Sequence, residues 1–370
     1  METIDDAGEF GLIARVQARL PLTSPDTLVP AGDDAAVLAA PDGRLAVSTD
    51  LLLEGRHFRR DWSSPRDIGH KAAAQNFSDI VAMGGVPTSL LLSMVLPGDL
   101  PVAWVEEFAE GVAGECARVG AIVAGGDMVR GDLITISVTV LGTLEGRAPV
   151  LRSGARPGDT VAVAGRLGWS AAGLELLLAG ERQGEGDAVA GSGDGANGSD
   201  AASSDLTGET PQSGARARGG APGDGAAEAD HGATGADFAT SAAPQAADYL
   251  IAHRRPSPPY AAGPEAARAG ATAMLDVSDG LLADLRHLAV ASGVAVDVDS
   301  TLLITDRGPR LDQVLTGGED HALVATFTSA DAVPEGWRPV GTVYAGAASV
   351  TVDGKPWEGA AGFSHFGRSA

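Results

Sequence analysis

The chain has 370 residues, which is enough for two domains of the ordinary size of about 150 residues. Its net charge of −23 at pH 7 argues against nucleic acid or an anionic membrane surface as the main partner. Hydrophobic residues make up 44% of the chain, enough for a core, and the single cysteine, Cys116, excludes a disulfide framework within the chain and is typical of a reducing compartment.

The start of the chain bears on where the protein is located. Residues 1–6 lack the basic and apolar regions of a signal peptide. No uninterrupted run of about 18 or more apolar residues occurs along the sequence. The sequence therefore predicts a cytoplasmic protein without a membrane span.

The first part of the chain is predicted to interleave helices with strands. Apolar residues recur at helical spacing in some stretches, and other stretches are short apolar runs bounded by turn residues. The predicted elements are a helix at 10–20, paired strands at 35–38 and 45–48 around a turn at 41–43, a helix at 65–83, a strand at 90–96, a helix from 101 to about 119, and strands at 122–124 and 133–141.

The helix at 65–83 has a clear start signal. Ser64 is predicted to be the N-cap, Pro65 the first helical residue and Asp67 the acidic third position. Asn76 and Asp79 are three residues apart and therefore share one face of this helix. A carboxylate and an amide on an otherwise apolar face are unusual in a core, and they fit better if that face meets a metal site.

The second part of the chain also mixes both kinds of element. Residues 184–247 consist mainly of Gly, Ala, Ser, Asp and Thr, and they cannot bury enough apolar surface to offset the entropy of ordering, so a disordered insertion is predicted. The fold class expected is α+β with two domains, at 1–148 and 149–370. The other predicted elements are strands at 160–164, 272–275, 294–298, 321–327, 340–343 and 348–352 and helices at 170–179, 263–270 and 281–291.

Carboxylates recur beside the ends of these elements or within a helix. Two adjacent aspartates at the start of a buried strand need compensation, and Asp33 and Asp34 precede such a strand. Together the carboxylates supply the hard oxygen ligands that Mg²⁺ prefers. The motifs are Gly32-Asp33-Asp34, Ser48-Thr49-Asp50, Asn76-Phe77-Ser78-Asp79, Gly125-Gly126-Asp127, Asp276-Val277-Ser278-Asp279-Gly280 and Gly317-Gly318-Glu319-Asp320.

Four other residues have a functional and a structural interpretation. Arg152 is either a contact to phosphate oxygens or an exposed surface arginine. Ser278 is interpreted as an N-cap of the helix at 281–291, which is compatible with an anion contact. A lone histidine such as His57 is more often structural than catalytic, and Lys71 is expected to be a solvated surface lysine rather than a phosphate partner.

The chain lacks the usual phosphate cradles. It contains no Gly-x-x-x-x-Gly-Lys-Ser/Thr motif and no protein-kinase signature set. If the ligands are phosphates, an acidic protein without these cradles would need metal ions to bridge its own charges and those of the phosphates.

Taken together, these motifs make the chain resemble the thiamine-monophosphate kinase family, in the superfamily of aminoimidazole ribonucleotide synthetase and selenophosphate synthetase. The resemblance covers nearly everything except the insertion. It rests on the carboxylate motifs above, in this order, and on three further motifs. These are Gly8-Glu9-Phe10-x-Leu12-Ile13, Gly55-x-His57-Phe58 and Arg152-Ser153-Gly154-Ala155-x-Pro157-Gly158-Asp159.

The resemblance implies that ATP donates its γ-phosphoryl group to thiamine monophosphate with Mg²⁺. Because the acceptor is a phosphate oxygen that is already ionised near neutral pH, our hypothesis is a direct in-line transfer without a general base. It also implies a homodimer whose N-terminal domains form a joint β-barrel, with the site between the N- and C-terminal domains. The metal ligands implied are Asp34, Ser48, Thr49, Asp50, Asp79, Asp127, Asp276 and Asp279. The ATP contacts implied are Gly126, Asp127, Arg152 and Ser278, and the thiamine phosphate contacts are His57, Glu319 and Phe363.

Two alternatives remain open. One is another ATP-dependent enzyme of the superfamily, such as aminoimidazole ribonucleotide synthetase. A selenophosphate synthetase would need a reactive N-terminal cysteine, whereas Cys116 lies inside a predicted helix, where it is expected to be buried. The other alternative is a non-catalytic acidic module that binds metal, although no EF-hand spacing occurs.

Overall fold

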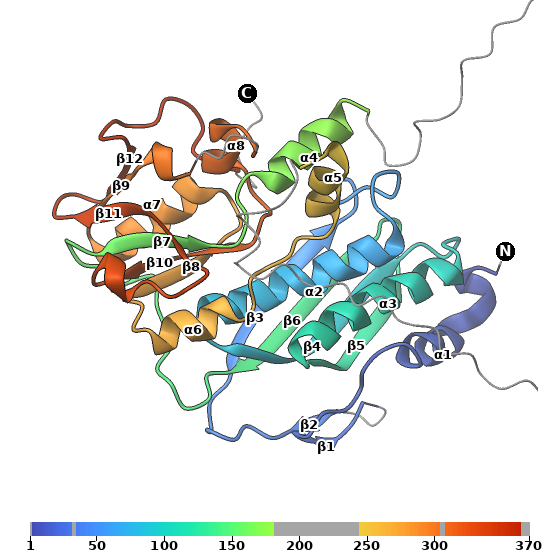
Figure 1. Cartoon of the computed structure of the whole chain (residues 1–370). Coiled ribbons are helices and arrows are strands. Elements are labelled where there is room, and N and C mark those ends of the chain that lie inside the picture. The colour runs from blue at the N-terminus through green and yellow to red at the C-terminus, as the bar shows by residue number, and fades with distance from the viewer. Residues whose placement is uncertain (1, 32–34, 181–243, 304–307, 364–370) are drawn as a thin grey trace, which may run out of the picture. The chain divides into compact units, whose positions relative to one another are not determined.

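A computed structural model describes residues 2–31, 35–180, 244–303 and 308–363 (Figure 1). Within these residues the strands form a four-stranded sheet, a six-stranded sheet and a two-stranded pair, with helices packed against the larger sheets. The mixed helix-and-strand fold that the sequence predicts is therefore confirmed. Among the described helices, none combines the length and the apolar character needed to cross a bilayer.

The four-stranded sheet is built from the first part of the chain. Its strand order is β3-β6-β4-β5, with β4 and β5 parallel and the other pairs antiparallel. The elements of this part are α1 (Ile4–Gln17), β1 (Thr27–Val29), β2 (Val37–Leu38), β3 (Ala46–Leu53), α2 (Pro65–Ala82), β4 (Val86–Leu96), α3 (Val102–Val119), β5 (Ile122–Arg130) and β6 (Thr135–Thr143).

Helices α2 and α3 lie side by side over one face of this sheet (Figure 1). The helices approach closely at Gly69, where an added Cβ would lie 2.1 Å from the Phe108 carbonyl oxygen. The start of α2 is as predicted: Ser64 Oγ accepts a hydrogen bond from the Asp67 amide, and the Asp67 carboxylate accepts one from the Ser64 amide. These contacts fix the position of α2, which carries several residues of the candidate site.

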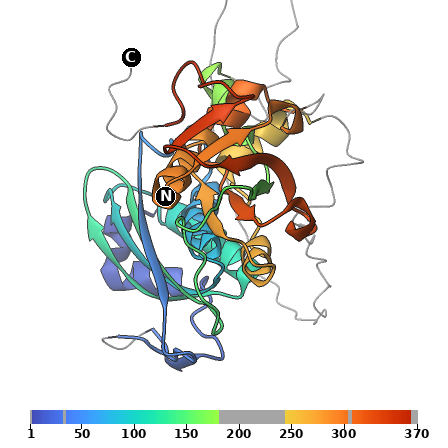
Figure 2. The same cartoon turned by 90° about the vertical axis from the view of Figure 1, so that its left-hand side faces the viewer.

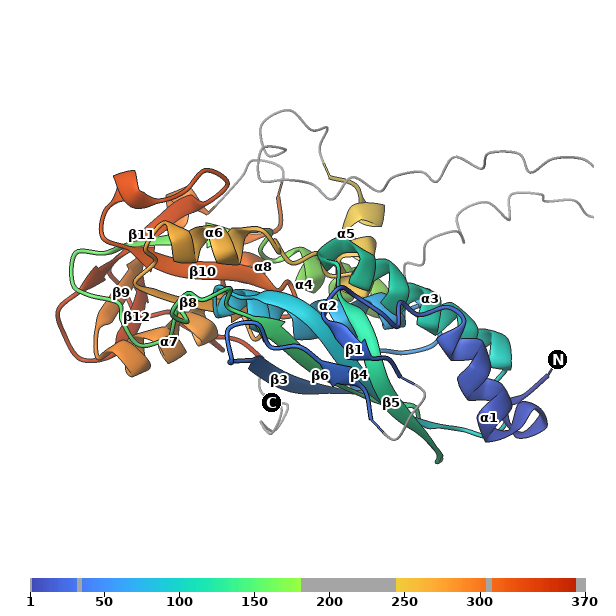
Figure 3. The same ribbon diagram turned by 90° about the horizontal axis from the view of Figure 1, so that it is seen from below.

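The opposite face of the four-stranded sheet carries exposed apolar side chains. Val47 and Leu51 of β3, Leu91 of β4 and Val129 of β5 are between 41% and 60% exposed. In Figure 3 the four strands lie between the viewer and α2. Since side chains alternate between the faces of a strand, one face of the sheet packs against helices and the other is open.

The six-stranded sheet is built from the second part of the chain, and its strand order is β12-β9-β11-β7-β10-β8 (Figure 2, where the later strands are orange to red). Helix α7 packs against β8 and β12. Along the chain it follows β8 after a short turn. The elements are β7 (Thr160–Ala164), α4 (Trp169–Leu178), α5 (Ala246–Arg254), α6 (Ala262–Arg268), β8 (Ala273–Val277), α7 (Leu281–Ser292), β9 (Ala295–Val298), α8 (Leu311–Thr316), β10 (Ala322–Phe327), β11 (Arg338–Tyr344) and β12 (Ser349–Val352), with short 3₁₀ turns at Ser300–Leu302 and Ala330–Ala332.

The predicted strand pair at 35–38 and 45–48 is wrong. Strand β2 pairs with β1, which the sequence analysis missed, and β3 pairs with β6. The turn at 41–43 exists but does not join a hairpin. The error arises because the partner of β3 lies about ninety residues further along, and a local turn signal carries no information about such a pairing.

Three helices differ from what the sequence predicts. The predicted helix at 10–20 is α1, which begins at Ile4 after a Thr3 capping box and is kinked at Gly8, where φ is 68°. Helix α8 was missed. Helix α5 begins at Ala246, so residues 246–247 are helical rather than disordered. Residues 184–243 of the insertion predicted at 184–247 lie outside the described residues.

Candidate active site

Strand β3, helix α2 and strand β8 bring three carboxylates together beside the helix-covered face of the four-stranded sheet. Ser48 of β3 donates a hydrogen bond from Oγ to Asp79 Oδ2 of α2 at 2.6 Å. Ser78, the residue before Asp79, donates to Asp276 Oδ2 of β8 at 3.2 Å. Asp50 accepts a hydrogen bond at 3.2 Å from Gln75, one turn before Asp79 on α2. Residues far apart in the sequence therefore meet at one place.

The electrostatics of this cluster favour a cation. Burial, followed by the negative charge of Asp276, raises the pKa of Asp79 to about 7, and Asp50 adds to the effect while the Ser48 hydrogen bond opposes it. Burial alone would lower the pKa of His321, but its 3.2 Å contact with Asp276 and the negative charge there raise it. Carboxylates that repel one another, with a serine hydroxyl beside them, suit a hard divalent ion, so these residues fit Mg²⁺.

Two of the implied metal ligands lie on the other face of the same sheet. Thr49 alternates with Ser48 and Asp50, and its hydroxyl donates to the Val138 carbonyl. Asp127 of β5 is exposed and pairs with Ser93, whereas its neighbour Met128 packs on the core. Thr49 and Asp127 sit on the two edge strands, which are three strand spacings, or about 14 Å, apart. Within one protomer they therefore do not meet.

Gly126 has a steric reason to be glycine. An added Cβ would lie 1.9 Å from the Leu92 carbonyl oxygen of the neighbouring strand β4. The backbone of β5 and β4 therefore approaches closely at the residue before Asp127. This fact explains the residue type, whether or not Gly126 contacts a nucleotide.

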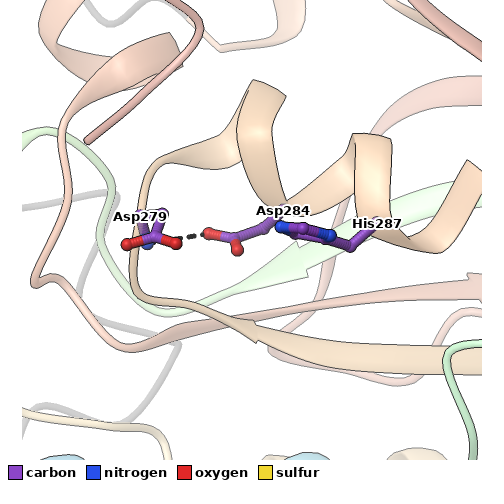
Figure 4. Close-up of side chains that lie close together, drawn as sticks. All are labelled: Asp279, Asp284 and His287. Atoms are coloured by element: carbon purple, nitrogen blue, oxygen red, sulfur yellow. Dashed lines mark hydrogen bonds between the residues drawn. The ribbon is translucent and has the colours of Figure 1, made fainter. Parts of the chain in front are cut away.

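The turn between β8 and α7, together with the helix itself, holds a second set of polar groups (Figure 4). Ligand atoms of Asp279, Asp284 and His287 all lie within 4.8 Å of one another. Asp284 accepts hydrogen bonds from the amides of Asp279 and Gly280 at 3.0 and 3.1 Å. Burial, and next the charge of Asp276, raises the pKa of Asp284 to about 7.

The predicted N-cap role of Ser278 is wrong. The N-cap residue of α7 is Gly280, with φ at 124° and no side-chain cap bond, and the free amides of the turn are bound by Asp284 from inside the helix. The Ser278 carbonyl oxygen instead accepts a hydrogen bond from the Glu319 amide at 2.8 Å. The error arises because a serine before a helix and an aspartate within its first turn compete for the same amides.

Two of the implied substrate contacts, His57 and Glu319, share one partner. Lys71 Nζ donates to Glu319 Oε2 at 3.0 Å and to the His57 carbonyl oxygen at 3.2 Å. Lys71 is only 3% exposed, so the expectation of a solvated surface lysine is wrong. The His57 ring is held as well, because the Leu53 amide donates to His57 Nδ1 at 2.9 Å.

Phe363 and Arg152 lie near opposite ends of α7. The Phe363 amide donates to the Asp279 carbonyl oxygen at 2.9 Å, and the Arg56 guanidinium lies 5.3 Å from the centre of the Phe363 ring. Arg152 is exposed, and its carbonyl oxygen accepts a hydrogen bond from Ser292, the last residue of α7. Twelve helical residues span about 18 Å, so Arg152 lies far from Asp279 in the same protomer. Asp34 lies outside the described residues.

Sequence reasoning missed several residues of this region. Lys71 and Gln75 precede the predicted ligand Asp79 at intervals of four residues on α2 and share its face, which was a usable signal. His321 follows the Gly-Gly-Glu-Asp motif directly, and Asp284 lies one turn into α7. Neither could be ranked from the sequence, since their roles depend on contacts across the fold with Asp276 or with the turn before α7.

Comparison with known proteins adds the family context. The family model for the N-terminal domain of AIR synthase related protein matches residues 32–144. A thiamine-monophosphate kinase of Mycobacterium tuberculosis is 40% identical over 99% of this chain and 93% of its own length.

Solved structures show the same similarity. A thiamine monophosphate kinase from Aquifex aeolicus is 30% identical, with a TM-score of 0.65, over 97% of this chain and all of its own. The structure of AaThiL complexed with AMPPCP and TMP is 31% identical, with a TM-score of 0.68, over 99% of both chains.

Proposed function

The chain belongs to the thiamine-monophosphate kinase family, and from this premise we propose that it transfers the γ-phosphoryl group of ATP to thiamine monophosphate, forming thiamine diphosphate and ADP. The observation that carries the proposal is the convergence of Asp50, Asp79 and Asp276 from three elements in a protein that has no P-loop. The AaThiL structure supports it, since AMPPCP is an ATP analogue and is bound there together with TMP.

Mg²⁺ is proposed as the ion that allows an acidic protein to bind two phosphorylated reactants. Ser48, Asp50, Asp79 and Asp276 would hold it on the helix-covered side of the sheet, and Asp279 would contribute beside α7. Bound Mg²⁺ supplies charge neutralisation for the phosphate oxygens. Ser78 and Gln75 orient two of these carboxylates by hydrogen bonds, which keeps their oxygens directed at one place.

The chain's own residues are proposed to hold the acceptor. The Leu53 amide donates to His57 Nδ1, so a neutral His57 ring carries its proton on Nε2 and presents a donor there. Glu319 presents a carboxylate that accepts hydrogen bonds, and Phe363 presents an aromatic ring close to the Asp279 turn. The acceptor phosphate oxygen is already ionised near neutral pH, so direct in-line attack requires no general base.

We further propose that the protein is a homodimer joined through the open face and the edges of the four-stranded sheet. A sheet face that exposes large apolar side chains on three of its strands is typical of an interaction surface. The edge strands of the sheet are β3 and β5. If two copies close an eight-stranded barrel, β3 of one subunit adjoins β5 of the other, and Asp127 then comes close to Thr49 of the partner subunit, the residue next to Asp50 on β3.

The remaining assignments are also proposals. Residues 1–148 would form the metal-binding and dimerisation domain and residues 149–370 the second domain, since the two large sheets lie on either side of this boundary. Gly126, Asp127, Arg152 and Ser278 are proposed ATP contacts, with Arg152 and Ser278 near opposite ends of α7. A cytoplasmic location is proposed from the single buried cysteine.

An ADP-release assay with Mg²⁺ and ATP tests the function directly. We expect ADP release with thiamine monophosphate and none with unphosphorylated thiamine, and mass spectrometry should identify thiamine diphosphate. The match to AIR synthase related protein makes formylglycinamidine ribonucleotide the appropriate rival substrate. Turnover of that compound, with no use of thiamine monophosphate, would contradict the proposal.

A further inference from the structure

Lys71 is an unusual residue for its position. It lies on α2, is 3% exposed, and is flanked by the fully buried alanines at 72–74. Lys71 and Lys355 are the chain's two lysines, and every other permanently cationic side chain is arginine. A buried lysine is costly unless its ammonium group is paired and hydrogen-bonded, so its contacts indicate what it does.

The ammonium group of Lys71 joins two parts of the molecule that are distant in the sequence. It donates to Glu319 Oε2, just before β10, and to the His57 carbonyl oxygen, just after β3. The Lys71 side chain is 4% exposed, whereas that of Glu319 is 34% exposed. The cation therefore lies behind a carboxylate that opens to solvent on its other side.

Lys71 is also the cation that compensates Glu319 near neutral pH. His253 Nδ1 lies 3.6 Å from Glu319 Oε2, but burial and the Lys71 charge lower the pKa of His253 to about 4, so its ring is neutral. Burial tends to raise the pKa of Glu319, but the charge and the hydrogen bond of Lys71 and the charge of His321 lower it, so the carboxylate is ionised.

Both partners of Lys71 have a backbone that other contacts already hold in place. Glu319 adopts a left-handed conformation with φ at 64°, and its amide donates to the Ser278 carbonyl oxygen. The His57 amide donates to the Leu53 carbonyl oxygen at 3.0 Å. With the backbone fixed, the side-chain direction of Glu319 is the remaining degree of freedom, and Lys71 sets it.

We propose that Lys71 is a positioning residue that fixes Glu319 and the His57 segment in one geometry, so that both engage the thiamine part of the acceptor. The inference rests on the proposed function. Lys71 does not touch the acceptor. It holds one carboxylate oxygen and leaves the solvent-facing side of Glu319 for a hydrogen-bond donor of the acceptor. A compact ammonium group suits this enclosed place better than the planar fork of arginine.

Steady-state kinetics of Lys71→Met and the exposed matched control Lys355→Met test the inference in the full chain. Loss of a charged hydrogen-bond partner should raise KM for thiamine monophosphate about tenfold or more in Lys71→Met, with KM for ATP within about twofold of wild type. Lys71→Arg should recover part of the loss, and Lys355→Met should match wild type. In a Glu319→Gln background, Lys71→Met should change KM little further, since its partner is already altered.

The possible outcomes separate the inference from the function. A Lys71→Met protein with an unchanged KM for thiamine monophosphate, equal rises in both KM values, or additive effects with Glu319→Gln would overturn the inference. A wild-type protein that releases no ADP with thiamine monophosphate would instead refute the proposed function, and the inference with it.

A spectroscopic test serves if Lys71→Met does not fold. Selective ¹³Cε-lysine labelling of the wild type gives two lysine signals, which the Lys355→Met spectrum assigns. Thiamine monophosphate should shift the Lys71 signal and leave the Lys355 signal in place, whereas AMPPCP alone should shift neither. A Lys71 signal that does not move at saturating thiamine monophosphate would overturn the inference.

Discussion

Strand β3 has two faces, and they place similar polar residues in different surroundings. On the helix-covered face, Ser48 and Asp50 meet Asp79 and Gln75 of α2. On the open face, Thr49 lies in a row of exposed apolar side chains that includes Val47 and Leu51. Alternation along one strand thus sends adjacent polar residues to opposite faces of the sheet.

The difference shows which part of the candidate site one protomer can complete. The helix-covered face has carboxylates that are coupled through their charges and that accept hydrogen bonds from neighbouring side chains. The open face holds Thr49 and Asp127 on separate edge strands. A second copy is the simplest way to bring the open-face ligands into a site, so the two faces make different predictions about where mutations act.

The largest effect is expected from Asp79→Asn on the helix-covered face. The amide keeps the size of the side chain but removes the charge that would bind Mg²⁺. We expect kcat to fall at least about 100-fold and the Mg²⁺ concentration for half-maximal rate to rise. Sedimentation should show the same oligomeric state as wild type. If the variant retained wild-type kinetics at low Mg²⁺, Asp79 would not be a metal ligand.

Substitution of Leu91 by Arg addresses the open face. A charge in the middle of an apolar interface should shift the protein from dimer to monomer, which light scattering after size-exclusion chromatography measures. Leu91 is 41% exposed in the protomer, so the fold itself should be retained. Activity should fall with the dimer fraction. An intact dimer, or a fully active monomer, would contradict the role we assign to this face.

Coexpression of Asp50→Asn with Asp127→Asn tests whether the two faces combine between subunits. Each variant alone should be nearly inactive. In a shared-site dimer, half of the assemblies are mixed and each mixed dimer has one intact site, so the mixture should recover roughly a quarter of wild-type activity. Absence of recovery, with mixed dimers demonstrated by two affinity tags, would place Asp50 and Asp127 outside a shared site.

Much of the helix-covered face could be anticipated from the sequence. The capping box at Ser64 predicted the start of α2 correctly. The carboxylate motifs contained the candidate metal ligands Ser48, Asp50, Asp79 and Asp276. What local patterns could not provide was strand pairing. The partner of β3 is β6, not the segment before the nearest turn, so neither the sheet order nor the face on which each residue lies could be derived.

Contacts between residues that are distant in the sequence could not be predicted either. Lys71 looked like a surface lysine because its compensation, Glu319, lies 248 residues further along. Ser278 looked like an N-cap because the competing Asp284 could be ranked only with the turn geometry known. In both cases the residue type was visible, and its role depended on a partner that spacing does not reveal.

A smaller effect concerns the pH dependence of stability without metal. The raised pKa of Asp79 means that the folded protein holds a proton up to about pH 7, whereas the unfolded carboxyl loses it near 3.8. Asp79 therefore contributes stability below pH 3.8 that is lost as pH rises to about 7. Metal-free Asp79→Asn should be more stable than wild type, and its advantage should be larger at pH 8 than at pH 5 by on the order of 2 kcal/mol. Urea denaturation with EDTA measures the difference, and a pH-independent difference would contradict it.

The smallest effect is expected from Ser64→Ala, which removes the side-chain acceptor at the start of α2. Loss of one N-cap should lower the free energy of unfolding by about 1 kcal/mol, measured by urea denaturation. The close contact of α2 with α3 at Gly69 still fixes the helix, so kcat and both KM values should stay close to wild type. If Ser64→Ala lost as much activity as Asp79→Asn, activity would depend on the position of α2 rather than on the charge of Asp79. The loss of activity in Asp79→Asn would then be no evidence for a metal site on the helix-covered face.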